Sequence, residues 1–231
     1  MDSAVTDHPG LHVDDVTVSF VVPRARVSGN HDPSGRLVVL DGVSLCVESG
    51  DVVALLGPSG SGKSTLLRVI AGIITVDSGR VLIDGVDVTE RPTHRRGVGM
   101  VFQDNQLFPH MSVLDNVAFG PKMAGVARFE RAERAAEWLR RVGLAGFESR
   151  RVTDLSGGEA KRVALARTLA AKPAVVLLDE PLTGLDRELH DRLAVELSTL
   201  LREAHTTALL VTHDPDEAAI VADRTVQLAD L

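Results

Sequence analysis

Short apolar runs alternate along this chain with longer segments whose apolar residues recur at helical spacing. The short runs are rich in Val, Leu and Ala and are bounded by turn residues, which is typical of buried strands. They are Val52–Leu56, Gly97–Phe102, Ala174–Leu178, Thr207–Val211 and Thr225–Leu228. The segments with helical spacing are Lys63–Ala71, Phe129–Val142, Gly158–Ala171 and Arg187–Ala204. Strands that alternate with helices predict βαβ units around a mainly parallel sheet.

Three other segments alternate apolar and polar residues, as antiparallel strands with one exposed face do. They are Val13–Val22, Leu37–Val47 and Arg80–Ile83, and the last leads into the turn dipeptide Asp84-Gly85. Between the first two, Pro23–Gly35 is rich in Pro, Gly and Ser and predicts a long connection. We therefore expect an antiparallel β-subdomain near the N-terminus.

The chain has no strand pattern between Phe102 and Ala174, and about residues 106–155 are mostly helical in pattern. This block predicts a helical lobe inserted into the α/β core. Before it, Pro92–Arg96 predicts a basic loop that leads into the strand at Gly97.

Composition narrows the class of protein. The 231 residues include 32 Asp and Glu against 25 Lys and Arg, so the formal net charge is −7. This balance argues against a main role in binding nucleic acid or anionic lipid. The content of 44% hydrophobic and 25% charged residues excludes a mainly disordered chain. With one cysteine, no signal-peptide pattern and no apolar run near the roughly 20 residues that span a bilayer, we expect a soluble, cytosolic protein.

A phosphate-binding motif follows the apolar run Val52–Leu56. The segment Gly57–Ser64 has the spacing G-x-x-x-x-G-K-[ST], with a strand pattern before it and a helix pattern after it. Its glycines let backbone N–H groups surround a phosphate chain at a helix N-terminus. Lys63 would reach the β- and γ-phosphates, and the Ser64 hydroxyl would hold Mg²⁺. The alternative is a glycine-rich turn that only caps a helix, and the complete motif in its context favours the nucleotide site.

A second strand delivers two acids to its carboxyl end. Val175–Leu178 is followed by Asp179 and Glu180, an arrangement in which Asp179 holds Mg²⁺ and Glu180 polarises an attacking water. Alone, these acids would more often be ordinary surface residues that end a strand. Together with the phosphate-binding loop, they favour a nucleoside triphosphatase site.

Two further features are a Ser-Gly-Gly segment between the phosphate-binding loop and the strand-end acids, and a histidine after those acids. Leu155–Glu159 precedes a helix that carries Lys161, Arg162 and Arg167, and its Ser-Gly-Gly offers N–H groups to a phosphate. His213 lies just past a strand pattern, where it would contact a γ-phosphate, although a histidine there is more often a plain loop residue.

Taken in this order, these elements resemble the nucleotide-binding domain of ABC transporters, from about Leu11 to Leu228. The most specific part is Leu155–Glu159, which is similar to the family signature LSGGQ. The resemblance implies an α/β fold: a P-loop NTPase core with a mainly parallel sheet, an N-terminal antiparallel β-subdomain and an inserted helical subdomain. The chain 1–231 would be a single ABC ATPase domain, with an ATP-binding core at about 11–105 and 172–231 and a helical signature lobe at about 106–171.

The resemblance also implies a role for each motif residue, with ATP and Mg²⁺ as cofactors. Glu180 matches the catalytic glutamate, His213 the switch histidine, and Gln103 the Q-loop glutamine that touches Mg²⁺ and the attacking water. The metal ligands would be Ser64, Gln103 and Asp179. The ATP-binding residues of the loop would be Gly57, Pro58, Ser59, Gly60, Ser61, Gly62, Lys63, Ser64 and Thr65.

The same resemblance implies an assembly. Ser156, Gly157, Gly158 and Glu159 would contact ATP held by another subunit, so two copies or two related subunits would meet head-to-tail. Asp186 matches the aspartate that couples the two sites. The expected partners are membrane permease subunits and a solute-binding protein, with no nucleic acid. The chain would lie at the cytoplasmic face of the membrane through its permease.

The run Leu107–Gly120 is similar to the corresponding segment of bacterial importer ATPases for polyamines, ferric iron, thiamine or oxyanions. Its apolar residues would accept a helix of a membrane partner or pack the helical lobe, and we expect some to do both. They are Leu107, Phe108, Met111, Val113 and Val117. The importer is the favoured interpretation. The alternatives are an exporter or lipid-extraction ATPase, and a non-transport or degenerate ABC protein.

Two positions depart from the family pattern. Glu159 stands where Gln is most common and removes a donor, so we expect tuned dimerisation without loss of function. The aromatic residue on which adenine usually stacks has no counterpart in Pro23–Gly35. Phe20 alternates with Val18 and Val22, which favours a core position over an adenine platform. With Val22 and His31 as weaker candidates, the adenine contact stays open.

Overall fold

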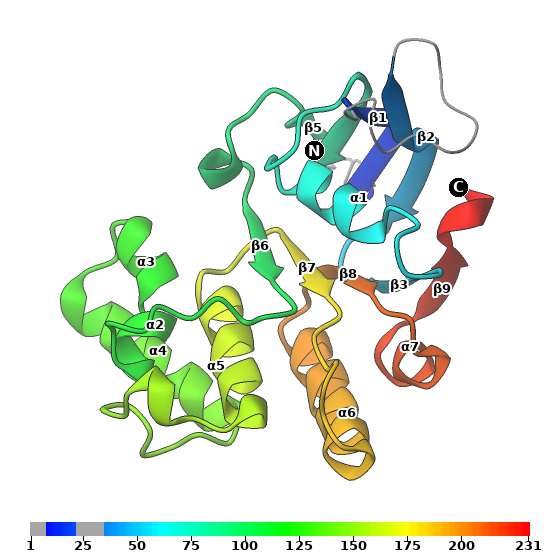
Figure 1. The fold of residues 1–231 in the computed structure, drawn as a ribbon. Helices are drawn as coiled ribbons and strands as arrows, with labels where there is room; N and C mark the ends of the chain where they lie inside the picture. The colour runs from blue at the N-terminus through cyan, green and yellow to red at the C-terminus, as the bar shows by residue number, and fades with distance from the viewer. Residues whose placement is uncertain (1–7, 22–34) are drawn as a thin grey trace, which may run out of the picture.

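The computed structural model describes residues 8–21 and 35–231, which form two stacked sheets and a helical lobe (Figure 1). The antiparallel sheet has the order β2-β1-β4-β5 and the parallel sheet the order β6-β7-β8-β3-β9. The first comprises β1 (Leu11–Val21), β2 (Arg36–Val47), β4 (Ser78–Ile83) and β5 (Val86–Asp87). The second comprises β3 (Val52–Leu56), β6 (Val98–Val101), β7 (Val175–Asp179), β8 (Thr207–Val211) and β9 (Arg224–Gln227).

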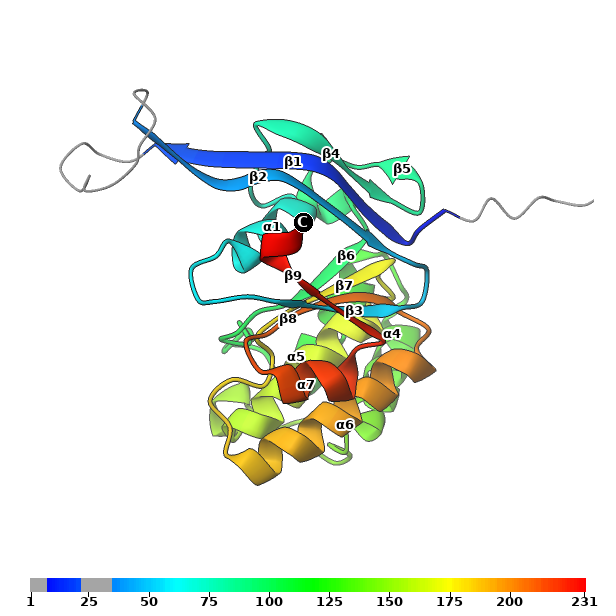
Figure 2. The same cartoon turned by 90° about the vertical axis from the view of Figure 1, so that its right-hand side faces the viewer.

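The helices lie in three places. Helix α1 (Lys63–Ile70) lies between the two sheets, whereas α5 (Gly157–Ala170), α6 (Arg187–Glu203) and α7 (Pro215–Val221) cover the other face of the parallel sheet (Figures 1 and 2). The lobe holds α2 (Val113–Val117), α3 (Phe119–Met123) and α4 (Arg128–Arg141). Short 3-10 turns occur at Thr93–Arg95, Val152–Asp154 and Leu228–Asp230. None of the helices in the described residues combines the length and the apolar content needed to cross a membrane.

The three central parallel strands, β7, β8 and β3, are buried on both faces, because each contributes to two separate cores. In β3, Val52 and Ala54 belong to the core formed with α5, α6, α7 and the lobe. The intervening Val53 and Leu55 belong to the core formed with α1 and the antiparallel sheet. Such two-sided burial explains why these strands are continuous apolar runs in the sequence.

The expected fold class is confirmed. All eight predicted strands are present with ends within two residues, and all four predicted helices with ends within one. The pattern missed β5, α3 and α7, which are two to seven residues long. Signals for α7 exist, since Asp214 caps the helix, Pro215 opens it and two acids follow in its first turn. Most of the predicted connection Pro23–Gly35, with His31, lies outside the described residues, as does Val22.

The predicted core position of Phe20 is wrong. Val16 and Val18 are buried, but the Phe20 side chain is 39% exposed. The register between β1 and β2 shifts between Val18 and Ser19, and both strands extend past α1 at this end (Figure 2). Within residues 8–21 and 35–231, no second layer covers these strand ends, so the alternation continues there without burial.

Arg96 is a buried cation that the basic-loop pattern did not indicate. Only 7% of it is exposed, and its guanidinium makes no ion pair in the described part of the chain. It donates instead to the carbonyl oxygens of Val69, Ile70, Thr89 and Arg91. Two of these carbonyls end α1, so the buried charge closes the C-terminus of the helix that follows the phosphate-binding motif.

Candidate functional site

The phosphate-binding motif forms a curled loop from β3 to α1. The Lys63 ammonium donates to the carbonyl oxygens of Gly57, at 2.6 Å, and Pro58, at 2.8 Å. The lysine is only 5% exposed. A buried cation bonded to two carbonyls of its own loop holds that loop in a closed curve.

Gly62 makes the turn from this loop into α1. Its φ of 106° lies in the left-handed region, and a Cβ there would be 3.0 Å from the carbonyl oxygen of Val39. Without a side chain at this position, α1 begins with no side-chain cap. Its first N–H groups are therefore available to an anion.

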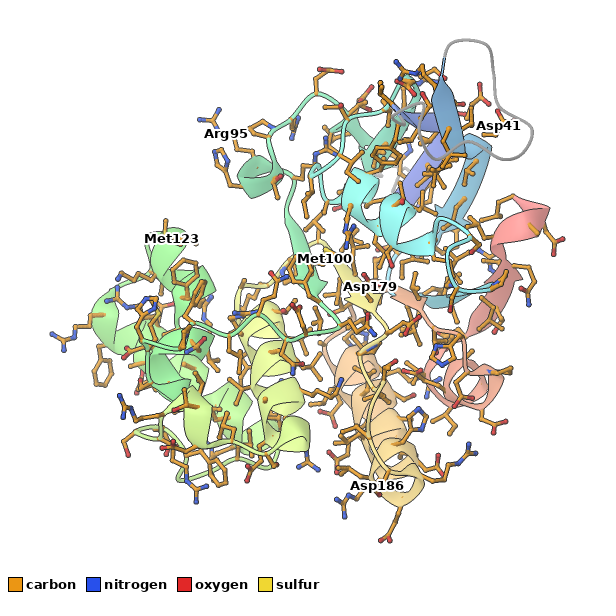
Figure 3. All side chains as sticks on the ribbon, viewed as in Figure 1. Asp41, Arg95, Met100, Met123, Asp179 and Asp186 are labelled. Atoms are coloured by element: carbon orange, nitrogen blue, oxygen red, sulfur yellow. The ribbon has the colours of Figure 1, made fainter. Side chains whose placement is uncertain are left out.

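The end of β7 meets the start of α1. The Ser64 hydroxyl donates to Asp179 Oδ1 at 2.8 Å, and Asp179 is 6% exposed. Figure 3 shows Asp179 at the end of β7, in the middle of the molecule. Burial raises the pKa of Asp179, while the Ser64 hydrogen bond and the charges of Arg68 and Lys63 lower it. Ser64, Asp179 and Gln103 line one cleft, so hydroxyl, carboxylate and amide oxygens gather where a hard cation would find ligands.

Glu180 is turned away from Asp179 by a left-handed backbone with φ 46°. Its Oε2 accepts a hydrogen bond from the Thr183 hydroxyl at 3.1 Å and lies 3.3 Å from His213 Nδ1. Its N–H donates to the carbonyl oxygen of Val211, at the end of β8. Glu180 and His213 therefore come together because β7 and β8 are neighbours and end at the same edge.

Eight of the eighteen predicted site residues line a neighbouring pocket, which shares Ser64 and Gln103 with this cleft. Its lining consists of Val39, Ser59, Gly60, Gly62, Lys63, Ser64, Thr65, Gln103 and Glu180. Gly57, Pro58 and Ser61 instead line a separate pocket beside Leu228. The fold thus collects the loop, the Q-loop glutamine and the strand-end acids, and it sets three loop residues on the other side.

The signature residues lie elsewhere, at the start of α5. Ser156 Oγ accepts the N–H of Glu159 at 3.3 Å, and Glu159 Oε2 accepts the N–H of Ser156 at 2.7 Å. This capping box lowers the pKa of Glu159, mainly through the Ser156 N–H. Since Gln also has a side-chain oxygen, Glu159 keeps the cap that the family residue would make.

The start of α6 lies beside the signature. A Cβ on Gly158 would be 3.2 Å from Leu189 Cδ2, and Leu189 N–H donates to Asp186 Oδ1 at 3.0 Å. Figure 3 shows Asp186 at the far end of the molecule from Asp179. The structure therefore groups the signature with Asp186 and separates both from the phosphate-binding loop of the same chain.

Two cations of α5 hold the loops that follow Gln103 and Glu180. The sequence analysis did not predict this role. Arg167 donates to the carbonyl oxygens of Asn105 and Gln106, whose φ angles are 59° and 43°. Lys161 donates to the carbonyl oxygen of Pro181, next to Glu180, at 2.7 Å. Burial lowers the pKa of both side chains. The sequence does contain a signal for this role. Most residues of α5 from Val163 to Ala170 are apolar and buried, so the cations of this helix need acceptors inside the protein.

The family model described as "ABC transporter" matches residues 40–183. The chain belongs to this family. One solved relative, the dimeric structure of MJ0796, a bacterial ABC transporter cassette, has a TM-score of 0.79 and 30% identity, covering 94% of this chain and 93% of the cassette. A second MJ0796 structure with the same scores and coverage is a post-hydrolysis state bound to ADP and Pi.

Two curated relatives of this ABC chain are importer components by name. The Fe(3+) ions import ATP-binding protein FbpC of Streptomyces coelicolor is 54% identical over 196 residues, which is 85% of this chain and 56% of that protein. The spermidine/putrescine import ATP-binding protein PotA of Acidothermus cellulolyticus is 49% identical over 191 residues, 83% and 50% of the two chains. The chain therefore spans about half the length of the curated relatives it matches.

The capping box predicts a contrast between two substitutions. Glu159→Gln keeps an oxygen for the Ser156 N–H and should leave the free energy of unfolding nearly unchanged. Glu159→Ala removes the acceptor and should lower it by about 1 kcal/mol near neutral pH. The loss in Glu159→Ala relative to the wild-type chain should shrink as pH falls through the lowered pKa of Glu159, because protonation weakens the wild-type acceptor. Urea unfolding of both variants measures it, and equal losses would contradict the cap.

Proposed function

We propose that this chain is the ATP-binding and ATP-hydrolysing subunit of an importer of a small polar solute. The observation that carries the proposal is the convergence of the loop lysine, the strand-end acids and His213 at one sheet edge. Lys63 holds the loop curled, Ser64 meets Asp179, and Glu180 meets His213. This arrangement offers a phosphate cradle, a metal position and a base in sequence along the cleft.

Each group has a step that it is suited to perform. The N–H groups of Gly57–Lys63 bind phosphate oxygens, and Lys63 exchanges its two carbonyl acceptors for the β- and γ-phosphates. Glu180 accepts the proton of a water whose oxygen attacks the γ-phosphorus, and ADP leaves with its bridging oxygen. His213 and Thr183 hold the Glu180 carboxylate in place.

The oxygens near Asp179 fit Mg²⁺. Ser64, Asp179 and Gln103 are hard donors, and few protein ligands suffice for an ion that keeps waters and phosphate oxygens. When bound, Mg²⁺ would neutralise charge on the phosphates. Residues Ser64 and Asp179 are already paired, so they need no large movement to hold it.

A substitution pair tests the chemistry. Glu180→Gln should lower ATP hydrolysis at least about 100-fold while ATP still binds, because the base is lost and the phosphate cradle remains. Lys63→Ala should weaken ATP binding itself by about tenfold or more, since it removes a charge-assisted contact. Fluorescent-nucleotide titration and phosphate release distinguish the two effects. Rapid hydrolysis by the Glu180 variant would reject the proposal.

The signature fits the proposed head-to-tail assembly. Ser156, Gly157, Gly158 and Glu159 would complete the ATP site of a second subunit, with Asp186 between the sites. Their separation from the loop of the same chain supports this, as does the dimeric cassette among the relatives. ATP would close the pair and hydrolysis would reopen it, driving a membrane partner. The Glu180→Gln variant should therefore form a dimer in ATP.

Phe20 is the residue that we propose as the adenine platform. It pairs with Leu37 across β1 and β2, and Val39, two residues along β2, lines the loop cleft. Residues two apart in a strand share a face, so the exposed ring lies on the cleft side of β2. The exposure of Phe20 contradicts a core position and leaves an aromatic face free for adenine. This is the kind of residue on which adenine usually stacks in the family.

Removing this ring should weaken nucleotide binding through the base alone. Phe20→Ala should raise the Kd for ATP about tenfold, as loss of a base–aromatic stack does, and Phe20→Trp should keep it. Inorganic triphosphate, which has no base, should compete equally well in both variants. Val21→Ala, at the exposed neighbouring position, is the matched control. An unchanged Kd for the Phe20→Ala protein would exclude the platform.

A groove on the lobe is the proposed permease contact. Met111, Asp115, Ala118, Phe119, Lys122 and Arg131 line it. Phe108 lies beside it, with its ring centroid 4.6 Å from that of Phe119. Val113 and Val117 are fully buried, so those two residues of the apolar run pack the lobe. Arg167 joins the groove to the Q-loop, because its guanidinium lies over Phe108 and bonds to Gln106.

The names of the relatives support ferric iron or a polyamine as the solute, delivered by a solute-binding protein to a permease at the membrane. A groove substitution should separate transport from nucleotide chemistry. Phe119→Ala in the native host should lower uptake of the solute severalfold, while the purified variant binds ATP normally. Val195→Ala, exposed on α6, is the control. Normal uptake of both iron and spermidine by the Phe119 variant would contradict the docking role.

A further inference from the structure

A buried carboxylate lies behind His213, and the proposed mechanism does not use it. Glu217, in the first turn of α7, is 2% exposed. Its Oε2 accepts a hydrogen bond from the Thr212 hydroxyl at 2.5 Å. Its Oε1 is buried and has no hydrogen-bond partner among the described residues. A buried acid with one unsatisfied oxygen is costly, so its position calls for a physical reason.

The four charged or titratable groups around Glu217 come from three segments of the chain: α5, α6 and the connection from β8 to α7. His190 of α6 places Nε2 3.9 Å from Glu217 Oε2 and 3.7 Å from Asp214 Oδ2. Lys161 of α5 and His213 face it more distantly, and both act on it through their charge. Burial is the main cause that raises the pKa of Glu217. Asp214 adds to it, and Thr212, His190 and His213 oppose it.

Thr212 connects this carboxylate to the proposed switch residue. The Thr212 hydroxyl also accepts a hydrogen bond from the Asp214 N–H at 3.0 Å. The same oxygen therefore bonds to both Glu217 and Asp214, and His213 lies in the chain between Thr212 and Asp214. The Asp214 carboxylate in turn accepts the N–H groups of Asp216 and Glu217. His213 is thereby held in a turn whose inner anchor is Glu217.

The same anchor lies near the helices that carry the other motifs. His190 lies one turn into α6, the helix that Asp186 caps. Lys161 lies on the signature helix and bonds to the loop just after Glu180. A movement of α6 would therefore reach the anchor of His213 through His190, and a movement of α5 would change the charge that Lys161 places near it.

We propose that Glu217 is a positioning residue that, through Thr212 and with His190 beside it, sets His213 against Glu180. The inference rests on the proposed ATPase function and names a residue pair on which hydrolysis depends and ATP binding does not. The hydrogen bond between Thr212 and Glu217 is its central element, and replacing that bond should move the His213 ring.

The matched pair Thr212→Ser and Thr212→Val tests the bond. Serine keeps the hydroxyl and valine keeps the shape without it. Thr212→Val should lower kcat about tenfold with an unchanged Kd for ATP, because a small displacement of a catalytic group is costly. Thr212→Ser should retain wild-type kcat. Asp216→Asn, an exposed neighbour that pairs with Arg187, is the control on α7 and should change nothing.

A double variant separates positioning from stability. Thr212→Val leaves Glu217 without its donor and is expected to destabilise the fold, whereas Thr212→Val with Glu217→Leu replaces the pair by apolar groups and should regain stability. If the bond positions His213, the double variant hydrolyses ATP as slowly as Thr212→Val alone. A stable double variant with wild-type kcat would overturn the proposal. A loss of ATP affinity in the Thr212→Val protein would also overturn it.

Glu217→Gln supplies a test by pH. A raised pKa means that the ionised acid is disfavoured in the folded chain, so the cost of Glu217 is present above its folded pKa and disappears below the ordinary carboxyl range. Glu217→Gln should therefore unfold at higher urea than wild type near neutral pH, and at the same urea near pH 3. It should also keep most of kcat, because the amide oxygen still accepts from Thr212. A Gln variant as slow as Thr212→Val would overturn the positioning role.

One measurement does not depend on hydrolysis. The ring signals of His213 in a histidine-labelled NMR spectrum, assigned with His213→Gln, should shift in Thr212→Val and stay in place in Thr212→Ser. If the wild-type chain lacks ATPase activity, the proposed function fails, and this spectrum still tests the anchor. Unmoved His213 signals in Thr212→Val would overturn it.

Discussion

The hydrogen bond from Ser64 to Asp179 joins the two halves of the site across 115 positions of sequence. It forms because α1 follows β3, and β3 and β7 lie on either side of β8 in the parallel sheet. The start of α1 and the end of β7 are therefore at the same edge. The neighbouring buried strands leave β7 no freedom to slide, since each of its four apolar residues is packed in one of two cores. The strand-end acids are therefore held against the phosphate-binding loop by the packing of the whole sheet.

Cations bonded to backbone carbonyls hold the irregular segments beside the parallel sheet. Lys63 bonds to carbonyls of its own loop, Arg96 closes the end of α1, and Arg167 holds the Q-loop. In each case the acceptor is a backbone carbonyl, so the charge fixes the path of the chain instead of pairing with an acid. One guanidinium can donate to several backbone carbonyl oxygens at once. It therefore satisfies carbonyls that have no hydrogen-bond partner within a helix or a strand.

The family motifs and the eight strands follow from local pattern, and so does the order in which they occur. The individual errors share a physical origin. Phe20 continues the alternation of β1 past the point where another layer covers it, and Arg96 enters the interior from a loop in which the preceding His94 and Arg95 are exposed. Glu159 differs from the family residue in charge and keeps its hydrogen bond, because the cap needs only an oxygen. Burial and partners are properties of neighbouring elements, and pattern along one segment does not contain them.

The sequence by itself determined the class of fold, the phosphate-binding loop and the identity of the acids at the strand end, because those features need particular residues at fixed local spacing. Only the tertiary structure decided that Thr212, Glu217 and His190 form one cluster behind His213, that Lys161 and Arg167 brace the two catalytic loops, and that the signature lies apart from the loop of its own chain. These relations join α5, α6, α7 and the strand ends. They exist because the helices pack on one face of the parallel sheet, and no local spacing specifies which of their polar side chains will meet there.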